Sequence, residues 1–409
     1  MSDFLPKTNL LPGDLVIQTA EMHAGGEKIR IIEAGFPELK GTTLLEKRKW
    51  LMESADQYRK FLLLEPRGQP SLTCALLVKP DSPEVSDVGV IFFDKDMYGA
   101  ACGTAVLCVS RYAVEKKLVQ PASPETRVVI QCPSGLVTTH VQYHNGRTGQ
   151  SRFQNVPSYV FARDVSVNVP GLGEVMTDIA FGGGFYAIVP AHRLGISLTE
   201  SSTDAILDIA QAVSIQIALS VQYSSVFRTL PFLESLRASV KLNHPDSNDL
   251  AFILGVIITS TDNDAKDTCN DPCVELGVFG KRQVVVRRPQ ALLTGLRDVT
   301  YKTGKWSERL AHGPCGSGTS ALMALLYDNG VLGLGEKRQF RNAIVGTVFT
   351  GSVVRETRVD GAGPLGGSVS GVIAEVAGHA FFTGSTAFTV EANDPVAAGY
   401  LPYRDAVSA

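Results

Sequence analysis

Short runs of apolar and β-branched residues recur along the chain at close intervals. Runs of this length, bounded by turn residues, are typical of strands. They cover residues 15–19, 28–32, 88–93, 127–131 and 136–142. Glycine, at 39 of 409 residues, supplies many tight turns between them. The pattern therefore predicts a mostly antiparallel sheet of the meandering or barrel-like kind.

Apolar residues with helical spacing occur in few places. These are residues 43–59, 103–117, 203–223 and 319–327. Because the helices are few and do not alternate with the strands, the predicted fold class is α+β rather than a doubly wound parallel sheet. At roughly 150 residues per domain, a chain of 409 residues is expected to form two or three domains.

Two of the predicted helices begin with similar sequences. Cys102-Gly103 opens one helix and Cys315-Gly316 opens another, each between small residues. Such an echo suggests two related domains whose helix starts meet at a cleft, a common place for a small-molecule site. The stretch 157–170, which contains proline and glycine, is the best boundary. We therefore expect a first domain over residues 1–160 and a second over residues 161–384.

The first residues of a helix have unpaired backbone N–H groups and a partial positive charge, so an anion such as a carboxylate binds well there. The same field favours the thiolate form of a cysteine at that position. Two such helix starts across a cleft would surround one carboxylate with donors and place a sulfur on each face of the adjacent carbon. This arrangement predicts a proton-transfer site with two bases, Cys102 and Cys315, and no electron-sink cofactor.

A free cysteine is more often a small buried apolar group than a catalytic one. Two cysteines in the same setting, both opening helices, favour the functional interpretation. Cys74, Cys108 and Cys132 lack that setting, and we expect them in the core.

The charge balance excludes several classes of partner. The chain has 38 basic and 41 acidic side chains, a net charge of −3, and no block of like charges. Neither nucleic acid nor an anionic membrane is therefore an expected partner. The apolar runs are too short for a membrane helix, and the first residues do not resemble a secretory signal, so we expect a cytoplasmic protein.

Metal and nucleotide cofactors are not expected either. The seven cysteines form no ligand pattern with histidine, because Cys269 and Cys273 have no second pair nearby. Gly316, Gly318 and Ala321 match a dinucleotide-binding fingerprint, but a polar segment stands where that fingerprint needs a hydrophobic strand. The sequence thus indicates a small-molecule substrate without a cofactor.

Many short motifs, in the same order, resemble the proline racemase family, which includes hydroxyproline epimerases and trans-3-hydroxyproline dehydratases. The matching positions are 21–27 with Arg30, 45–48, 65–68, 102–103, 178–183, 185–187, 314–321, 378–380, 383–384 and 394–395. The resemblance runs along most of the chain. It implies two pseudo-symmetric domains of the diaminopimelate epimerase type, each strand-rich and wrapped around a central helix, with the active site between them. It also implies that residues 385–409 return to the first domain.

The resemblance implies roles for particular residues. Cys102 and Cys315 look like the two catalytic bases. The carboxylate cradle would consist of the backbone N–H groups of Gly103, Thr104, Gly316 and Ser317. Two further candidates for substrate binding are Phe279 and His312.

Four departures from the family pattern fall on substrate recognition. Thr104 and Gln69 stand where the family has histidines, and Ala311 replaces an aspartate that holds the substrate's ammonium. Thr73 stands where the family has a pocket aromatic. In addition, residues 285–312 correspond to an insertion of roughly 26 residues, rich in basic side chains. This segment is either an active-site lid or a surface excursion, and a lid would favour a bulkier, anionic substrate.

These features favour a cofactor-independent racemase or epimerase that inverts the α-carbon of a proline-like or modified imino acid. The family's dehydratases typically carry threonine at the second cysteine, so Cys315 favours inversion over dehydration. A trans-3-hydroxyproline dehydratase-like lyase and a small-molecule-binding protein without catalysis are the alternatives. A homodimer is also possible.

Overall fold

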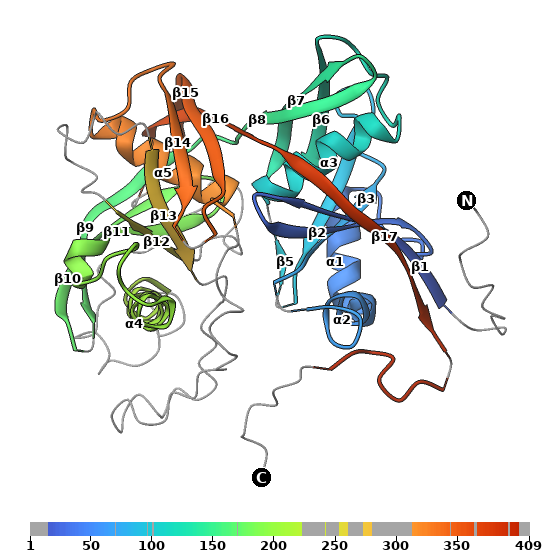
Figure 1. Ribbon diagram of the computed structural model, residues 1–409, viewed down its shortest axis with the longest axis horizontal. Helices are drawn as coiled ribbons and strands as arrows, with labels where there is room; N and C mark the ends of the chain where they lie inside the picture. Colours follow the sequence, from blue (N-terminus) through green and yellow to red (C-terminus); the bar gives the residue numbers. More distant parts are fainter. Residues whose placement is uncertain are drawn as a thin grey trace.

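The computed structural model describes most of the chain. The described residues are 15–69, 71–95, 97–99, 102–169, 171–222, 242, 253–260, 273–279, 313–343, 345–363, 366–391 and 393–400. Within them, many strands and few helices form an α+β fold, as expected from the sequence. Figure 1 shows two lobes side by side, one formed by the first part of the chain and the other by the middle and later parts.

The first lobe contains the elements up to β8. They are β1 (Leu15–Ala24), β2 (Glu27–Ala34), α1 (Leu44–Ser54), α2 (Asp56–Leu63), β3 (Thr73–Val78), β4 (Val88–Phe93), β5 (Tyr98–Gly99), α3 (Gly103–Glu115), β6 (Glu125–Cys132), β7 (Gly135–His144) and β8 (Arg147–Gln154). The later elements are β9 (Tyr159–Val169), β10 (Gly173–Phe181), β11 (Phe185–Pro190), η1 (Ala191–Leu194), α4 (Thr203–Gln222), β12 (Ile253–Thr259), β13 (Cys273–Phe279), α5 (Gly316–Asp328), β14 (Lys337–Asn342), β15 (Val348–Val359), β16 (Val369–Gly378) and β17 (Ala380–Val390).

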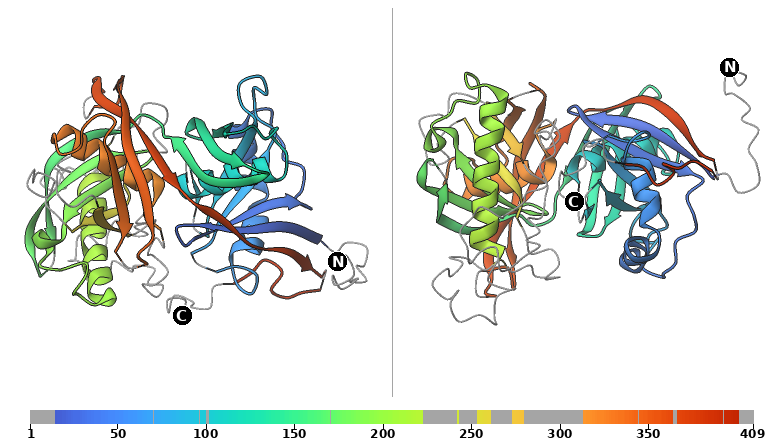
Figure 2. Two further views of the ribbon diagram at one scale, coloured as in Figure 1. Left: turned by 45° about the horizontal axis from the view of Figure 1, so that its top comes forward. Right: turned by 90° about the horizontal axis from the view of Figure 1, so that it is seen from below.

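The described strands form one continuous network of hydrogen-bonded pairs. Most of the pairs are antiparallel, as predicted, but β2–β3, β4–β6, β11–β12 and β13–β14 are parallel. β8 pairs with β7 of the first lobe and with β16 of the second. β17 leaves the second lobe and pairs with β1 along its length (Figures 1 and 2). Two strands therefore connect the lobes through backbone hydrogen bonds.

Helices α3 and α5 occupy the centres of the two lobes. α3 contacts β1, β2, β6, β7 and β8, and α5 contacts β9, β10, β11, β15 and β16. Every residue of α5 from Gly316 to Leu326 is buried, and α3 is buried almost as completely. A helix that is apolar on all sides is stable only inside a core. Both helices belong to one apolar cluster that continues from one lobe into the other.

Two further clusters lie on the outer sides of the sheets. One packs α4 against strands β9 to β12, and the other packs α1 and α2 against β1, β3 and β4. In the right-hand view of Figure 2, α4 lies in front of the strands of the second lobe. The helices that cover the sheets from outside are thus distinct from the two that lie at their centre.

The predicted helices at 43–59 and 319–327 need correction. The first is two helices, because Ala55 leaves the helical conformation with φ −142° and is buried between them. A new helix starts at Asp56, whose carboxylate accepts hydrogen bonds from the side chains of Arg59 and Tyr98. α5 begins earlier than its apolar spacing indicates, at Gly316. Its first turn consists of small residues, which carry little periodic signal.

The C-terminal segment is attached to the first lobe. Arg67 forms an ion pair with Asp394, at 3.2 Å, and donates to the carbonyl groups of Val396 and Ala397. Glu65 and Tyr400 exchange backbone hydrogen bonds. Arg67, within the matching stretch at residues 65–68, therefore attaches the C-terminal segment to the first lobe. The division at residues 160 and 161 and the diaminopimelate epimerase type stay predictions, and the expected boundary stretch 157–170 is mostly strand β9.

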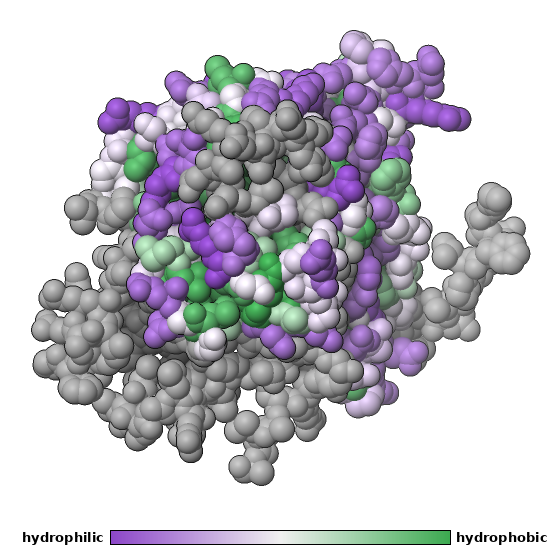
Figure 3. All heavy atoms as spheres, turned by 60° about the vertical axis from the view of Figure 1, so that its left-hand side comes forward, coloured by the Kyte–Doolittle hydropathy of each residue, from purple (hydrophilic) through white to green (hydrophobic). Residues whose placement is uncertain are grey.

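The exposed side chains of the described residues do not indicate a particular binding partner. Hydrophobic residues gather near the middle of the face shown in Figure 3, with hydrophilic residues around them. Single exposed apolar side chains, such as Leu172 and Leu334, are normal on protein surfaces. No helix within the described residues has the length and apolar character needed to cross a membrane. A homodimer and a cytoplasmic location stay predictions.

We expect Arg67→Lys to destabilise the protein by about 1 to 3 kcal/mol, because an ammonium cannot donate to Asp394, Val396 and Ala397 from one planar group. Urea unfolding measures the loss, and limited proteolysis should cut faster among residues 393–400. Arg147→Lys, at the exposed first residue of β8, is the matched control. Equal stability of the two variants would show that this attachment contributes nothing.

Candidate active site

The starts of α3 and α5 touch each other at two glycines. A Cβ on Gly103 would lie 2.7 Å from the Cα of Gly316 and 2.8 Å from Cζ of Phe153. A Cβ on Gly316 would meet the Cα of Gly103 at 2.8 Å and the same ring atom at 2.9 Å. No real Cβ fits at such distances. The two glycines therefore bring the helix starts together over the buried ring of Phe153.

Cys102 and Cys315 are the N-cap residues of these two helices, as the sequence predicts. Both are partly exposed, whereas Cys74, Cys108 and Cys132 are buried. Burial raises the pKa of each of these three thiols above its ordinary value of 9.0. Their expected place in the core is thus confirmed, and the two cysteines at the helix starts are more accessible than these three.

Each helix start has free backbone donors. The first intrahelical hydrogen bonds run from Val106 N to Cys102 O, at 2.9 Å, and from Thr319 N to Cys315 O, at 2.8 Å. The N–H groups before Val106 and Thr319 consequently have no intrahelical acceptor. They belong to Gly103, Thr104 and Ala105 on α3, and to Gly316, Ser317 and Gly318 on α5. Two sets of donors with partial positive charge therefore meet between the cysteines, which suits a carboxylate.

Cys315 has a specific polar environment. The hydroxyl oxygen of Tyr186 lies 3.5 Å from Sγ of Cys315 and 2.7 Å from Oγ of Ser317. Sγ and the Ser317 Oγ are 3.6 Å apart. Burial, followed by the nearby charge of Cys315 and, more weakly, of Cys102, raises the pKa of Tyr186 well above 10.0. Tyr186 thus lies beside one thiol and within electrostatic reach of the other.

The backbone of Cys315 is unusual, with φ +63° and ψ 108°. A non-glycine residue in this region costs of order 1 to 3 kcal/mol, and such strain persists only where the surroundings impose it. Those surroundings hold the two residues before Cys315. Thr319 Oγ1 donates to the carbonyl of Pro314, and Asn342 Nδ2 donates to that of Gly313, both at 3.0 Å.

The turn between β1 and β2 supports the same segment from the first lobe. Gly25 has φ +61°, and a Cβ there would approach Cδ of Pro314 to 3.1 Å. Thr347 Oγ1 donates to the carbonyl of Gly25 at 2.7 Å. The motif at residues 21–27 thus forms a hairpin that packs just before the second cysteine.

The glycine turn between β10 and β11 packs against the first turn of α5. A Cβ on Gly182 would lie 2.3 Å from the carbonyl oxygen of Ser317. The buried side chain of Asn155 donates to the carbonyl of Gly182 at 2.7 Å. The motif at residues 178–183 therefore positions the second helix start.

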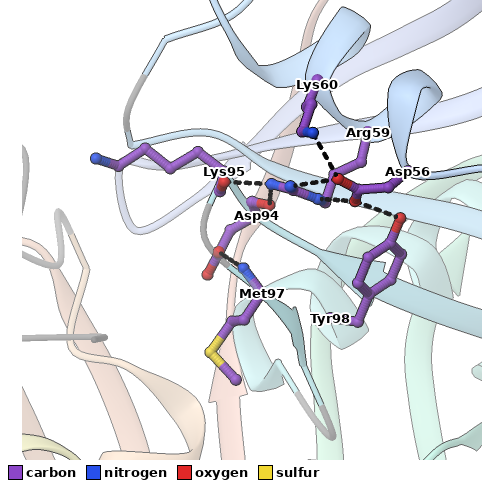
Figure 4. A network of polar contacts seen from close by, with 7 residues as sticks. All are labelled: Asp56, Arg59, Lys60, Asp94, Lys95, Met97 and Tyr98. Carbon is purple, nitrogen blue, oxygen red and sulfur yellow. Dashed lines mark hydrogen bonds and ion pairs between the residues drawn. The ribbon is translucent and has the colours of Figure 1, made fainter. Parts of the chain in front are cut away.

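A polar network joins α2 to residues that follow β4, a few positions before Cys102 (Figure 4). Arg59 pairs with Asp56 at 2.6 Å and donates to the carbonyl groups of Asp94 and Lys95. Tyr98 O–H donates to the Asp56 carboxylate at 3.2 Å. This network therefore holds Asp94, Lys95 and Tyr98 against α2.

The structure describes only some of the other residues that the sequence predicts for the site. Thr104 and Ser317 are buried in the first turns of their helices. Phe279 is the last residue of β13, where its backbone pairs with Val256. His312, Ala311 and the predicted insertion at 285–312 lie outside the described residues, so the lid stays a prediction. No cluster of at least three histidine, cysteine or acidic side chains suited to a metal occurs in the part of the chain that is described.

The structure shows contacts of Tyr186 and Arg30 that the sequence did not predict. Tyr186 was part of a matching motif, residues 185–187, but its side chain gave no sign that it would reach Cys315. Arg30, which belongs to the first matching motif, ties the first lobe together by pairing with Glu21 at 2.8 Å and donating to the carbonyl groups of Leu62 and Arg67.

Gly103→Ala should destabilise the protein by roughly 1 to 3 kcal/mol, because the added methyl group meets backbone and a packed ring that cannot move aside. Gly384→Ala is the matched control, since a Cβ there has no neighbour within 4 Å. We expect the control to stay within about 0.5 kcal/mol of the parent in urea unfolding. Similar stabilities for the two variants would contradict the close contact of the helix starts.

Asp56→Asn tests the network in Figure 4 through its pH dependence. Burial raises the pKa of Asp56, but hydrogen bonds and charges from Arg59 and Lys60 outweigh it, so the pKa lies below its ordinary 3.8. A lowered folded-state pKa stabilises the protein above about pH 4 and loses this effect as the pH falls through the folded-state value. The variant should therefore be less stable at pH 7, by about 1 kcal/mol or more, and the difference should shrink towards pH 3.

Urea unfolding at both pH values measures this difference. The control is Glu53→Gln, whose carboxylate is mostly exposed and lies 4.0 Å from Lys49. A pH-independent gap between Asp56→Asn and the parent would mean that the Asp56 carboxylate is not the stabilising group.

Most of the chain is similar to known proteins. The family model described as proline racemase matches residues 19–277 and 288–401. Trans-L-3-hydroxyproline dehydratase of Saccoglossus kowalevskii is 40% identical over 381 residues, which cover 93% of this chain and 99% of the relative. The 3-hydroxyproline 2-epimerase of Burkholderia multivorans is 34% identical over 385 residues, covering 94% and 98%.

A solved structure has the same fold. It is a hydroxyproline epimerase from Agrobacterium vitis with bound trans-4-hydroxy-L-proline, with a TM-score of 0.74, 24% identity and coverage of 94% of both chains. The family model and the curated relatives extend over nearly the full length of the chain. This chain therefore belongs to the proline racemase family.

Proposed function

We propose that the protein is a cofactor-independent epimerase or racemase that inverts the α-carbon of a proline-like imino acid, with hydroxyprolines as the first candidates. The observation that carries this proposal is the contact between two helix starts, each capped by a partly exposed cysteine. The names of the relatives support the substrate class, since epimerases and dehydratases of hydroxyproline are both among them.

In the proposed reaction, the substrate's carboxylate binds to the N–H groups that begin α3 and α5. One cysteine, as thiolate, removes the proton from the α-carbon, and the electron pair of that C–H bond moves towards the carboxylate. The N–H donors stabilise the negative charge that develops on its oxygens. The opposite cysteine, as thiol, then gives its proton to the other face of the carbon. The product is the inverted imino acid, and the two sulfurs have exchanged protonation states.

Dehydration is the second candidate, and a specific observation favours it. Several relatives at 38% to 40% identity are named trans-3-hydroxyproline dehydratases, whereas the named epimerase is 34% identical. In this reaction one cysteine removes the α-proton, and the C–O bond at the neighbouring carbon breaks. The departing hydroxide takes a proton and leaves as water, and the resulting enamine rearranges to a cyclic imine.

Of these two reactions, the residue at the position of the second cysteine favours epimerisation. The family resemblance associates dehydratases with threonine at that position, and this chain has Cys315. Thr104, in place of the family's histidine beside the first base, leaves room for altered substrate recognition.

Turnover in D₂O separates the two reactions. We expect trans-3-hydroxy-L-proline, trans-4-hydroxy-L-proline or L-proline to yield an inverted product with one deuterium on the α-carbon, detected by NMR and chiral chromatography. A cyclic imine, formed from the 3-hydroxy compound alone, would instead support dehydration. Neither product from any of the three would refute both proposals and leave binding without catalysis.

Variants of the cysteines refine this test. Cys102→Ser and Cys315→Ser should each lower kcat/KM for inversion by about 10²- to 10⁴-fold, because each removes a general acid–base group. Cys108→Ala, a buried position in α3, is the control and should retain activity. Imine formation that survives in Cys315→Thr while inversion is absent would assign the protein to the dehydratases.

A further inference from the structure

The environment of Cys315 contains two hydroxyl groups that the proposed reaction does not use directly. Tyr186 is 2% exposed and comes from β11, whereas Ser317 comes from the first turn of α5. Their oxygens are 2.7 Å apart, a strong hydrogen bond, and both lie within reach of the Cys315 sulfur. Three polar atoms thus form a closed triangle at the start of α5.

The position of the sulfur is defined further by its apolar neighbours. A Cβ on Gly318 would lie 3.4 Å from Sγ of Cys315 and 3.3 Å from Cδ1 of Ile257. The sulfur therefore lies over the first turn of α5, between this glycine and the two hydroxyl groups.

We propose that Tyr186 is a positioning residue for Cys315, and that with Ser317 it satisfies the hydrogen bonding of this sulfur in both of its protonation states. This inference rests on the proposed function and assigns residues to one of its two bases. It concerns what happens at the sulfur as the reaction runs in each direction.

The hydrogen-bond inventory of the triangle supports this role. Each hydroxyl has one hydrogen to donate and accepts through its oxygen. When Cys315 is a thiolate, Ser317 donates to Tyr186 and Tyr186 donates to the sulfur. When Cys315 is a thiol, its S–H donates to Tyr186, and Tyr186 donates to Ser317. The direction of the chain reverses by rotation of hydrogens, with no movement of the heavier atoms.

A group that alternates between base and acid benefits from such an environment. Cys315 would begin one reaction direction as thiolate and the opposite direction as thiol. An environment that satisfied only one state would leave a buried polar group unpaired in the other, at a cost of about 1 to 3 kcal/mol. Because burial raises the pKa of Tyr186 far above neutral, its hydroxyl stays protonated and available as a donor.

Tyr186→Phe tests the proposal without depending on turnover. Iodoacetamide reacts with thiolates, and removal of a donor from a thiolate lowers its population more than it raises its intrinsic reactivity. We expect alkylation of Cys315 to slow by about tenfold, with Cys102 in the same sample changed by less than twofold. Peptide mass spectrometry over a time course gives both rates at one pH.

The matched control is Tyr159→Phe, which removes another buried tyrosine hydroxyl but lies in the apolar cluster beside α4 rather than in the cluster of α3 and α5. Its Cys315 to Cys102 rate ratio should equal that of the parent. Equal ratios in all three proteins, or a parallel change of both cysteines in Tyr186→Phe, would overturn the proposal, because a structural disturbance would affect both helix starts.

Kinetics provide the second measurement. If inversion is observed, Tyr186→Phe should lower kcat by about tenfold or more with little change in KM, since the hydroxyl acts on the sulfur and not on substrate binding. A rise in KM alone would contradict the positioning role. If the parent shows no turnover, the proposed function fails, while the alkylation ratio still decides whether Tyr186 acts on Cys315.

If Tyr186→Phe does not fold, Ser317→Ala provides a second test of the proposal. It removes one small hydroxyl and retains the backbone N–H. We expect the alkylation rate of Cys315 to fall relative to that of Cys102, in the same direction as for Tyr186→Phe. An unchanged ratio in Ser317→Ala would contradict the chain of hydrogen bonds that joins Ser317, Tyr186 and the sulfur.

Discussion

The contact of Gly103 with Gly316 over the ring of Phe153 is the constraint on which the rest of the structure depends. Two helix starts, each with partial positive charge, repel one another weakly and have no intrinsic reason to meet. They do so here because α3 and α5 are buried in one apolar core, and because neither has a side chain at the point of contact. A Cβ on either glycine would separate the donors and the two cysteines that stand beside them.

The connection between the lobes maintains this contact. β8 carries Phe153 and pairs with β7 on one side and with β16 on the other. β17 extends the second lobe into the sheet of the first, where Arg67 holds the residues that follow. The ring beneath the site therefore belongs to a strand that both lobes share. A displacement of one lobe would have to break backbone hydrogen bonds in β8 or β17.

The two cysteines are similar in sequence but not in conformation. Cys102 has an extended backbone, with φ −149°, whereas Cys315 has φ +63°. The Gly25 hairpin, Asn342 and Thr319 all hold the segment around Cys315, and Tyr186 and Ser317 approach its sulfur. Strain of this kind has to be balanced by packing elsewhere, and here the balancing contacts come from both lobes. The two helix starts thus have similar sequences, but the two cysteines differ in backbone conformation and in the residues that contact them.

The sequence by itself determined the strand-rich α+β class and the two helix starts, each with its cysteine. These are local properties, because apolar periodicity, small residues and turn glycines act within a few positions along the chain. The family motifs also marked residues 21–27 and 178–183, whose glycines prove to pack around the second helix start. The break at Ala55 was missed because it depends on the Asp56–Arg59–Tyr98 network, which joins residues some forty positions apart. Only the tertiary structure placed Tyr186 beside Cys315 and Gly103 against Gly316, since these pairs are separated by more than a hundred residues and their distances are decided by how the core packs.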